Sequence, residues 1–306
     1  MVDLKNDDVI LEPFAGSNNI PRMLDDGDII SDNNWSCFDI EPGNNAYPKS
    51  RIVQRDTIKN YPVGFRVAIT NPPYLSKNSA TRRGLEYPKT RYDDLYKLCL
   101  DKMLENTPFV AAIIPETFIN SGLFHDRLYA VISLTCKMFS DTDCPVCLAL
   151  FVPKNMAPES FEIYRMNELL GSFKELSSGD IKDSLGIKWT FNDKSGSIGI
   201  WCIDNTRFAS IEFGDGKKIP SSSIKNTSRS LTRVGGLPDD VDFGKFIDSC
   251  NRILKKYRQD TKDVFMASFK GLRVDGLYRR RLDFATARKI MNQALLEQIK
   301  EGVDET

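Results

Sequence analysis

The sequence has 306 residues, of which 41% are apolar and 27% charged, which is typical of a folded globular protein and excludes a disordered chain. No apolar run approaches the roughly 20 residues that a transmembrane helix needs, and the first residues lack the order of a signal peptide. We therefore expect a cytoplasmic protein with no membrane partner. The seven cysteines are odd in number and scattered, so we expect reduced thiols and no disulfide framework.

The distribution of charge is more informative than its total. Basic and acidic side chains balance at 42 each. Residues 1–155 contain 17 basic and 20 acidic side chains, whereas residues 156–306 contain 25 and 22. The excess is concentrated in residues 251–300, with 13 basic and five acidic side chains. If nucleic acid binds this chain, we expect much of the phosphate contact in that segment.

The first half of the chain alternates short apolar runs with amphipathic stretches, which predicts βα units and a mostly parallel sheet. Prolines at 153 and 158 break this pattern, so we place a domain boundary near residue 155, between domains 1–155 and 156–306. The predicted strands are 8–12, 35–40, 51–54, 67–70, 109–114, 148–152, 198–203 and 210–213; the predicted helices are 18–25, 92–104, 243–257 and 283–300, and 217–238 is a predicted polar loop region.

The first motif is an apolar strand that runs into Glu12, then a turn of small residues that opens a helix. Gly16 lacks a Cβ, so the chain can bend sharply there and a ligand can approach the backbone. The helix N-terminus that follows favours a carboxylate. Many α/β proteins turn in this way without binding a ligand, so the motif alone leaves both interpretations open.

Acidic residues end the next two predicted strands. Asp39 can accept hydrogen bonds from both hydroxyls of a ribose, and Ile40 can lie against one face of an adenine. Asp56 can accept a hydrogen bond from the adenine amino group, or it is an ordinary surface aspartate. Together with the first motif, these residues predict a nucleoside-containing cofactor at one edge of the sheet.

The most informative string is Asn71-Pro72-Pro73-Tyr74, directly after the strand 67–70. The two prolines stiffen the backbone and leave the Pro72 carbonyl free of a strand ladder. That carbonyl and the Asn71 side-chain oxygen can both accept from the hydrogens of a planar amine, which localises the lone pair of its nitrogen. Tyr74 can stack on a base that has left the duplex. This arrangement suits methyl transfer to an amine, in which positioning provides most of the rate.

These residues resemble the amino-methyltransferase family, and the Asn-Pro-Pro-Tyr form is similar to the N6-adenine DNA methyltransferases. The resemblance spans residues 8–152, and its order of cofactor motif, catalytic motif and target-recognition region is the gamma arrangement of that family. It implies an α/β fold: a Rossmann-like methyltransferase domain, with a mostly parallel twisted sheet and helices on both faces, plus a smaller α+β target-recognition domain.

The resemblance also implies S-adenosylmethionine as the cofactor, no metal, and a flipped-out adenine of duplex DNA as the target. The implied catalytic residues are Asn71, Pro72 and Tyr74, and the implied cofactor-binding residues are Glu12, Phe14, Ala15, Gly16, Asp39, Ile40, Asp56, Thr57 and Asn71. Family members carry a further cofactor-contacting segment before the first strand, where this sequence has about seven residues. We expect one of these first residues, or a distant part of the chain, to take its place.

Basic residues in three places are candidate DNA contacts. Residues 75–85 form either a mobile loop that closes over DNA or a solvated surface loop. The run Arg279-Arg280-Arg281 is either a solvated face or a set of phosphate contacts. The predicted DNA-binding residues are Lys77, Arg82, Arg83, Arg229, Arg233, Lys270, Arg273, Arg279, Arg280 and Arg281.

The function expected from the sequence is a site-specific DNA adenine-N6 methyltransferase of a restriction-modification system or a phage. A cognate restriction endonuclease with the same recognition site is the expected protein partner, and we expect a monomer or weak dimer. The alternatives are an RNA or protein-glutamine N-methyltransferase and a non-catalytic, methyltransferase-like nucleic-acid-binding subunit. Cys144 and Cys147 have the spacing of a zinc or redox pair but lack a second pair, and His125 is expected at the surface or in a cap.

Overall fold

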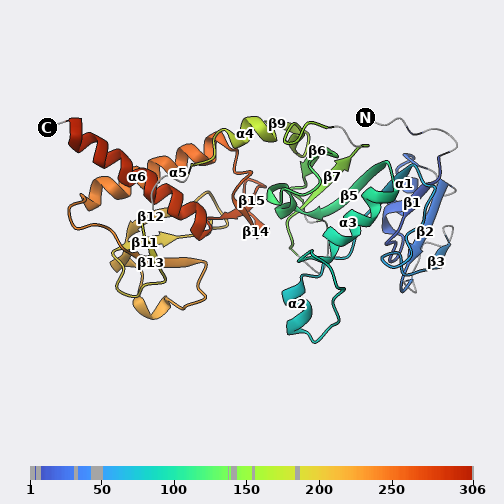
Figure 1. The fold of residues 1–306 in the computed structure, drawn as a ribbon, viewed down its shortest axis with the longest axis horizontal. Helices are drawn as coiled ribbons and strands as arrows, with labels where there is room; N and C mark the ends of the chain where they lie inside the picture. Colours follow the sequence, from blue (N-terminus) through green and yellow to red (C-terminus); the bar gives the residue numbers. More distant parts are fainter. Residues whose placement is uncertain are drawn as a thin grey trace. The chain divides into compact units, whose positions relative to one another are not determined.

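The computed structural model describes residues 4, 8–30, 34–42, 51–136, 138, 143–153, 156–182 and 187–304. Contacts divide the chain into two compact units, the first comprising residues 1–134 and 146–169 and the second residues 135–145 and 170–306 (Figure 1). This division lies later than the boundary predicted near residue 155. The reason is that residues 162–165 form a strand that pairs with the sheet of the first unit.

Nine strands form one mixed sheet in the order β3-β2-β1-β4-β5-β7-β6-β8-β9. Strands β1 to β5 pair in parallel, whereas β7 runs antiparallel between β5 and β6. The strands are β1 (Ile10–Glu12), β2 (Trp35–Asp39), β3 (Ile52–Gln54), β4 (Val67–Thr70), β5 (Phe109–Pro115), β6 (Leu128–Ser133), β7 (Val146–Phe151), β8 (Glu162–Arg165) and β9 (Glu168–Ser172). The predicted α/β fold class is confirmed, and the sequence analysis missed β6, β8 and β9.

The helices of the first unit connect these strands. Helix α1 (Asn19–Asp26) links β1 to β2, and α2 (Lys77–Arg82) and α3 (Leu95–Asn106) lie between β4 and β5; η2 (Glu116–Asn120) follows β5. Because the chain moves in opposite directions along the sheet in these two crossovers, right-handed connections place α1 and α3 on opposite faces. Helix α3 begins three residues later than predicted, because Asp94 is extended and forms a β-bridge with Ser76.

Burial of the central strands explains why their sequences are continuous apolar runs. All three residues of β1 are buried, and Leu11 and Ala68 of β1 and β4 are fully so. Strands covered on both faces do not alternate apolar and polar residues. The carboxyl end of this buried centre is where the sequence changes to Glu12 and Asn71, so the polar residues that follow these strands lie together at one edge of the sheet.

The second unit combines a four-stranded antiparallel sheet, a two-stranded ribbon and two long helices. The sheet order is β10-β13-β11-β12, and β14 pairs with β15. The elements are α4 (Phe173–Ser177), β10 (Thr190–Phe191), β11 (Ile198–Trp201), β12 (Glu212–Asp215), η3 (Gly216–Lys218), η4 (Ser221–Ser223), β13 (Leu231–Gly235), α5 (Phe243–Asp260), β14 (Ala267–Leu272), β15 (Tyr278–Arg281) and α6 (Phe284–Asp304). The expected polar loop over 217–238 is wrong at β13, which pairs with both β10 and β11.

The helices α5 and α6 pack on this unit's own core. Phe246 of α5, Met291 of α6 and Ile200 of β11 belong to one cluster of buried side chains. The sequence analysis missed β13 because only two of its residues, Thr232 and Val234, are buried, and Ser, Arg and Gly residues surround them. Such a short period-two pattern gives little signal in a sequence.

A buried ionic network holds the ends of the second unit's elements together. The fully buried Asp204 carboxylate accepts two hydrogen bonds from the Arg258 guanidinium, both at 2.9 Å, and one from Arg273 at 3.2 Å. It also accepts from the backbone N–H groups of Ser210 and Arg280. Burial raises the pKa of Asp204, but the hydrogen bonds and charge of Arg258 and the backbone donors outweigh this effect and lower it. The carboxylate is thus held ionised inside the unit.

Candidate active site

A cavity of about 310 Å³ lies in the first unit at the carboxyl ends of β1, β2, β3 and β4. The strand order reverses between β1 and β4, and the crevice at such a switch point is where open α/β sheets bind ligands. Its lining residues are Phe14, Asp39, Ile40, Asp56, Thr57, Ile58, Asn71, Pro73 and Leu95. Most were predicted site residues. Pro73 belongs to the string 71–74 but was not a predicted site residue, and Ile58 and Leu95 were missed because nothing in their local sequence distinguishes them from core residues.

The Asp39 carboxylate joins two neighbouring loops at this cavity. Its Oδ2 atom accepts a hydrogen bond from the Gly16 N–H at 2.8 Å, and its Oδ1 atom accepts one from the Glu41 N–H at 2.8 Å. The Ala15 N–H donates to the carbonyl of Phe38 at 2.9 Å alongside. Because a carboxylate offers about four acceptor positions, Asp39 retains acceptor capacity for a ligand's hydroxyl groups.

The turn at Gly16 leaves space beside the backbone. Gly16 has φ 52°, in the left-handed region that favours glycine, and a Cβ added there would meet no atom within 4 Å. The backbone at this point is therefore open to a ligand, as the sequence motif predicted. Neither Gly16 nor Ala15 is among the residues that line the cavity; Ala15 is buried and lies beside β2.

Glu12 lies beneath the cavity and connects β1 to β4. Its Oε1 atom accepts hydrogen bonds from the Phe14 N–H at 3.0 Å and the Thr70 hydroxyl at 2.5 Å. Glu12 is 1% exposed, and burial raises its pKa to about 8, although both hydrogen bonds oppose that shift. Glu12 does not line the cavity; it fixes Phe14, which does.

The far wall of the cavity is formed by the loops after β2 and β3. Ile40 is 62% exposed although it is a large apolar residue. Asp56 accepts from the Lys59 N–H at 3.1 Å and pairs with its ammonium group at 2.9 Å. Partial burial raises the pKa of Asp56, but the hydrogen bonds and charge of Lys59 outweigh it and lower the pKa. The Thr57 hydroxyl donates to the Pro13 carbonyl at 2.9 Å, so it ties this wall to the turn after β1.

The side chains of Asn71 and Tyr74 are joined by a hydrogen bond. The Tyr74 hydroxyl lies 2.6 Å from the Asn71 Oδ1 atom and 2.7 Å from the carbonyl oxygen of Ile113 in β5. The Tyr74 ring meets Tyr96 edge to face, with 6.2 Å between centroids. Pro72 is buried and Pro73 exposed. The Tyr74 hydroxyl has one proton, which the Asn71 oxygen and the Ile113 carbonyl share, and this contact with the Asn71 amide was not predicted from the sequence.

The segment after Tyr74 forms an arm whose base is closed by backbone contacts. The Lys77 N–H donates to the Asp93 carbonyl and the Leu95 N–H donates to the Leu75 carbonyl. Residues 76–92 contain five basic residues and one acidic residue. Figure 1 shows α2 in this arm, projecting from the body of the first unit, and its predicted DNA-binding residues Lys77, Arg82 and Arg83 are all exposed.

The basic residues predicted to bind DNA in the second unit divide into two groups. Arg273 and Arg280 are 8% and 6% exposed; Arg273 bonds Asp204 and Asp275, and Arg280 bonds Ser268. Their guanidinium groups are used inside the unit, and we therefore remove both from the set of proposed phosphate contacts.

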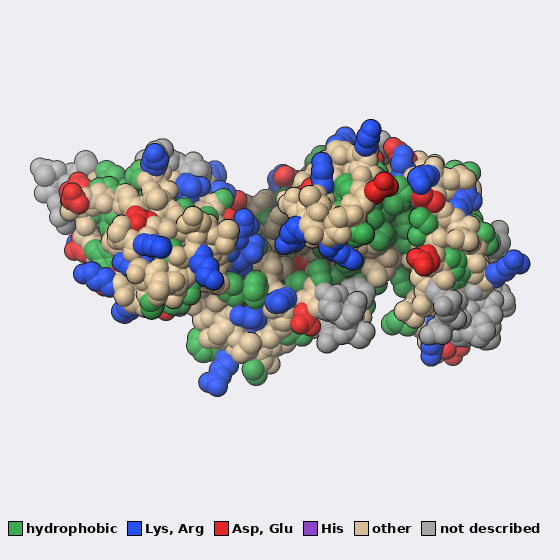
Figure 2. Space-filling view, turned by 90° about the horizontal axis from the view of Figure 1, so that it is seen from below, with side chains coloured by type: hydrophobic (Ala, Val, Ile, Leu, Met, Phe, Trp, Pro, Cys, Tyr) green, Lys and Arg blue, Asp and Glu red, His purple; other side chains and the backbone are tan. Residues whose placement is uncertain are grey.

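The remaining candidates are more accessible. Arg233 and Arg279 are half-buried and donate to the carbonyls of Gly196 and Asp204. Arg229 and Lys270 are exposed, and Arg281 is half-exposed. On the face seen in Figure 2, lysine and arginine side chains (blue) predominate over acidic ones (red).

The structure gives no support for a catalytic histidine or a reactive cysteine among the other described residues considered in the sequence. The His125 ring packs on Phe161 with 4.9 Å between centroids, and burial lowers the pKa of the imidazole. Burial raises the pKa of the Cys147 thiol well above its ordinary value, which disfavours a reactive thiolate. Among the described residues, no group of His, Cys, Asp and Glu side chains has the arrangement of a metal site. No helix in the described parts of the chain has the length and apolarity needed to cross a membrane.

One of the first residues, or a distant part of the chain, was expected to complete the cofactor pocket. Of residues 1–7, only Leu4 is described, and it lines an apolar cavity on β4, β5, β6 and β7 rather than the one beside Asp39. The other six residues lie outside the described part of the chain.

No protein-family model and no curated protein matches this sequence. Among solved structures, a class I S-adenosylmethionine-dependent methyltransferase of Listeria monocytogenes is 14% identical, with 53% of this chain and 59% of that chain covered and a TM-score of 0.37. The type I restriction-modification methyltransferase subunit of Streptococcus thermophilus is also 14% identical, with 52% and 42% covered and a TM-score of 0.36.

The type IIG restriction endonuclease BpuSI is 17% identical, with 53% of this chain and 24% of that chain covered and a TM-score of 0.38. In all three comparisons the match spans less than two thirds of the neighbour's own length. With TM-scores below 0.5, these are distant similarities, and the proposal below depends on the site's own residues.

The raised pKa of Glu12 predicts a pH dependence of stability. The folded state holds a proton up to about pH 8, whereas the unfolded state loses it near 4.5. The stabilisation is therefore complete below about pH 4.5 and is lost as the pH rises towards 8, at a slope of up to about 1.4 kcal/mol per pH unit. Glu12→Gln cannot ionise, so its free energy of unfolding should decline less than that of the wild type between pH 5 and 8.

Denaturant titrations at several pH values measure this difference. Glu212→Gln is the matched control, because Glu212 is exposed on β12 of the second unit. The control should retain the wild-type pH dependence. A wild-type slope retained in Glu12→Gln would show that Glu12 is ionised in the folded protein.

Proposed function

We propose that this chain is an S-adenosylmethionine-dependent methyltransferase that acts on the N6 amine of adenine in duplex DNA. The observation that carries the proposal is that Asn71 lines the same cavity as Asp39 and Ile40. The side of the cavity formed by Asp39 and Ile40 suits a nucleoside, and the side formed by Asn71 offers an amide oxygen to an amine. The first unit is thus the proposed catalytic domain, and the second is the proposed target-recognition domain.

The residues around the cavity fit the adenosine part of the cofactor. Asp39 keeps acceptor positions that suit the ribose hydroxyls, although both its oxygens already bond backbone amides. The exposed Ile40 offers an apolar surface of the kind that an adenine ring covers. The open backbone at Gly16 lets a ligand approach without a clash. Bound S-adenosylmethionine supplies a methyl group activated by a positively charged sulfur.

The chain's own contribution to the reaction is to hold the amine. The Asn71 Oδ1 atom accepts from the Tyr74 hydroxyl and has a second acceptor position for one amine hydrogen. The Pro72 carbonyl is the proposed acceptor for the other hydrogen, which draws the nitrogen lone pair out of conjugation. Pre-positioned groups of this kind lower the barrier because they pay their orientation cost before the reaction.

Duplex DNA is the proposed substrate because of the positions of exposed cations. The arm that follows Tyr74 presents Lys77, Arg82 and Arg83 at the surface. Exposed cations gain affinity for phosphates by releasing counterions, so binding should weaken as salt is raised. A cognate restriction endonuclease that reads the same site is the protein partner that this function implies.

Incubation with methyl-labelled S-adenosylmethionine and either duplex DNA, RNA or cellular protein, followed by nucleoside and amino-acid analysis, tests the proposal. Label in N6-methyladenine from DNA is the expected result. Label confined to RNA or to glutamine side chains would show that DNA is not the substrate. Cofactor binding with no methyl transfer to DNA, RNA or protein would indicate a non-catalytic subunit.

Asn71→Ala removes the side-chain acceptor. We expect methyl transfer to fall by at least about 10²-fold, as when one pre-organised polar partner of a transition state is lost. Cofactor binding, followed by calorimetry, should persist because Asp39 and its backbone donors remain. Asn106→Ala, at the end of α3, is the matched control and should keep full activity. Wild-type turnover in Asn71→Ala would refute the assigned role.

Tyr74→Phe and Tyr74→Ala separate the hydroxyl from the ring. Loss of the bond to Asn71 costs about 1 kcal/mol, so Tyr74→Phe should lower kcat roughly fivefold and leave the KM for DNA unchanged. Tyr74→Ala also removes the stacking ring and should raise that KM. If Tyr74→Phe matches the wild type in both constants, the hydroxyl does not position Asn71.

A further inference from the structure

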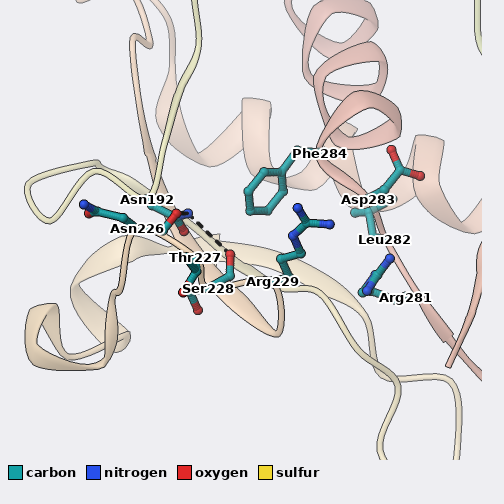
Figure 3. Close-up of a pocket in the computed structure, with 9 residues that line it drawn as sticks. All are labelled: Asn192, Asn226, Thr227, Ser228, Arg229, Arg281, Leu282, Asp283 and Phe284. Carbon is teal, nitrogen blue, oxygen red and sulfur yellow. Dashed lines mark hydrogen bonds between the residues drawn. The ribbon is translucent and has the colours of Figure 1, made fainter. Parts of the chain in front are cut away.

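A second cavity, of about 470 Å³, lies entirely within the second unit. Figure 3 shows its lining residues, which come from three segments: residue 192 after β10, the loop 226–229 before β13, and residues 281–284 at the junction of β15 and α6. The Asn192 side chain donates to the carbonyls of Asn226 and Ser228, at 3.2 and 3.3 Å, and so fastens the loop to β10. Hydrogen bonds between two of these segments therefore hold this side of the cavity together.

Two arginines that line this cavity have guanidinium groups without a partner among the described residues. Figure 3 shows Arg229 beside the ring of Phe284, and Arg281 on the other side of Arg229. In the described part of the chain, neither side chain makes a hydrogen bond or an ion pair, whereas the guanidinium groups of Arg273 and Arg280, close to Arg281 in the sequence, are bonded inside the unit. Positive charge is thus available in the cavity.

The one acidic residue in the lining is already engaged. The Asp283 Oδ1 atom accepts from the N–H groups of Ala285 and Thr286, both at 2.9 Å, and its Oδ2 atom accepts from the Thr286 hydroxyl. This carboxylate caps the start of α6, so the first amides of the helix are not offered to a ligand. The cations at Arg229 and Arg281 are the groups left to hold an anion.

An aromatic wall stands next to the two cations. The Phe284 ring stacks on Phe191 with 4.4 Å between centroids and 16° between planes, and the Arg288 guanidinium lies 5.4 Å from the centre of the Phe191 ring. The contacts with Phe284 and Arg288 restrain the Phe191 ring, and the two stacked rings form the wall. A flat apolar surface beside two guanidinium groups is complementary to a nucleotide, which carries a ring and an anionic phosphate.

We propose that this cavity binds a backbone phosphate of nucleic acid through Arg229 and Arg281, with the sugar or base of the same nucleotide against Phe284. Guanidinium groups suit this role because their planar N–H forks match phosphate oxygens. The inference depends on the proposed function in one respect, that DNA is the substrate. It replaces the basic run 279–281 with a specific pair of arginines as the main phosphate contact of the second unit.

The test measures binding of a fluorescently labelled duplex DNA to the full chain over a range of salt concentrations. Arg229→Ala/Arg281→Ala should weaken binding about tenfold or more. The slope of log affinity against log salt is negative, and in this variant it should become less steep by about 1, the value for one phosphate contact. Arg229→Lys/Arg281→Lys keeps both charges and should keep the wild-type slope. Circular dichroism of each variant shows whether the fold is retained.

The matched control removes two positive charges elsewhere in the same unit. Lys217 and Lys218 are exposed on η3 and do not line the cavity, so Lys217→Ala/Lys218→Ala should leave the slope nearly unchanged. Equal losses of DNA affinity in Arg229→Ala/Arg281→Ala and in Lys217→Ala/Lys218→Ala would show a diffuse charge effect and overturn the proposal. Wild-type protein that does not bind DNA would overturn it as well.

A further arm distinguishes a polymer phosphate from a free nucleotide. Deoxyadenosine monophosphate should compete with the duplex only at millimolar concentrations; micromolar competition that depends on Arg229 and Arg281 would assign the cavity to a free nucleotide instead. Methyl transfer is measured in parallel. Cavity-dependent DNA binding without methyl transfer would contradict the proposed function alone, and methyl transfer with unchanged binding in Arg229→Ala/Arg281→Ala would contradict the cavity alone.

Discussion

The proposed site depends on one carboxylate shared between two loops. Asp39 accepts the N–H groups of Gly16 and Glu41, so the turn after β1 and the end of β2 hold a single geometry. A buried or half-buried carboxylate that accepts two backbone N–H groups is a strong, charge-assisted connection. The Ala15 N–H bond to the Phe38 carbonyl connects the same turn to β2, and Asp39 adds the contact that joins Gly16 to the residues after this strand.

A second connection aligns the other side of the cavity. Glu12 at the end of β1 bonds Thr70 at the end of β4, and Asn71 follows Thr70 directly. The strand order therefore brings the proposed nucleoside-binding edge and the proposed amine acceptor next to each other at the point where the sheet reverses. In this account, catalysis by positioning is a consequence of the sheet topology, and Tyr74 refines it by orienting the Asn71 amide.

The sequence predicted the parts of the molecule whose physics is local. Continuous apolar runs predicted β1 and β4, and polar residues at their ends predicted most of the cavity lining. The contacts of Leu95 and Ile58 were not predictable, because they depend on where α3 and the loop after β3 come to lie. The strand β13 was missed because its two buried residues alternate with polar ones over only five positions.

The run Arg279-Arg280-Arg281 shows how a missed strand changes a functional prediction. As three adjacent cations, they looked equivalent in the sequence. In β15 successive side chains point to opposite faces, so Arg280 is buried with Tyr278 while Arg279 and Arg281 are half-exposed. Burial then decides which arginines remain available to a phosphate, and the Arg281 guanidinium has no hydrogen-bond or ion-pair partner in the described part of the chain.

Isothermal titration of the purified full chain with S-adenosylmethionine tests the central claim, that the cavity at the reversal of the sheet holds the methyl donor. The account predicts saturable binding to the wild type and a loss of affinity of about tenfold or more in Asp39→Ala, which removes the ribose acceptor, with Asp248→Ala on the exposed face of α5 unchanged. Absence of binding to the wild type, or equal affinity in a folded Asp39→Ala variant, would contradict it.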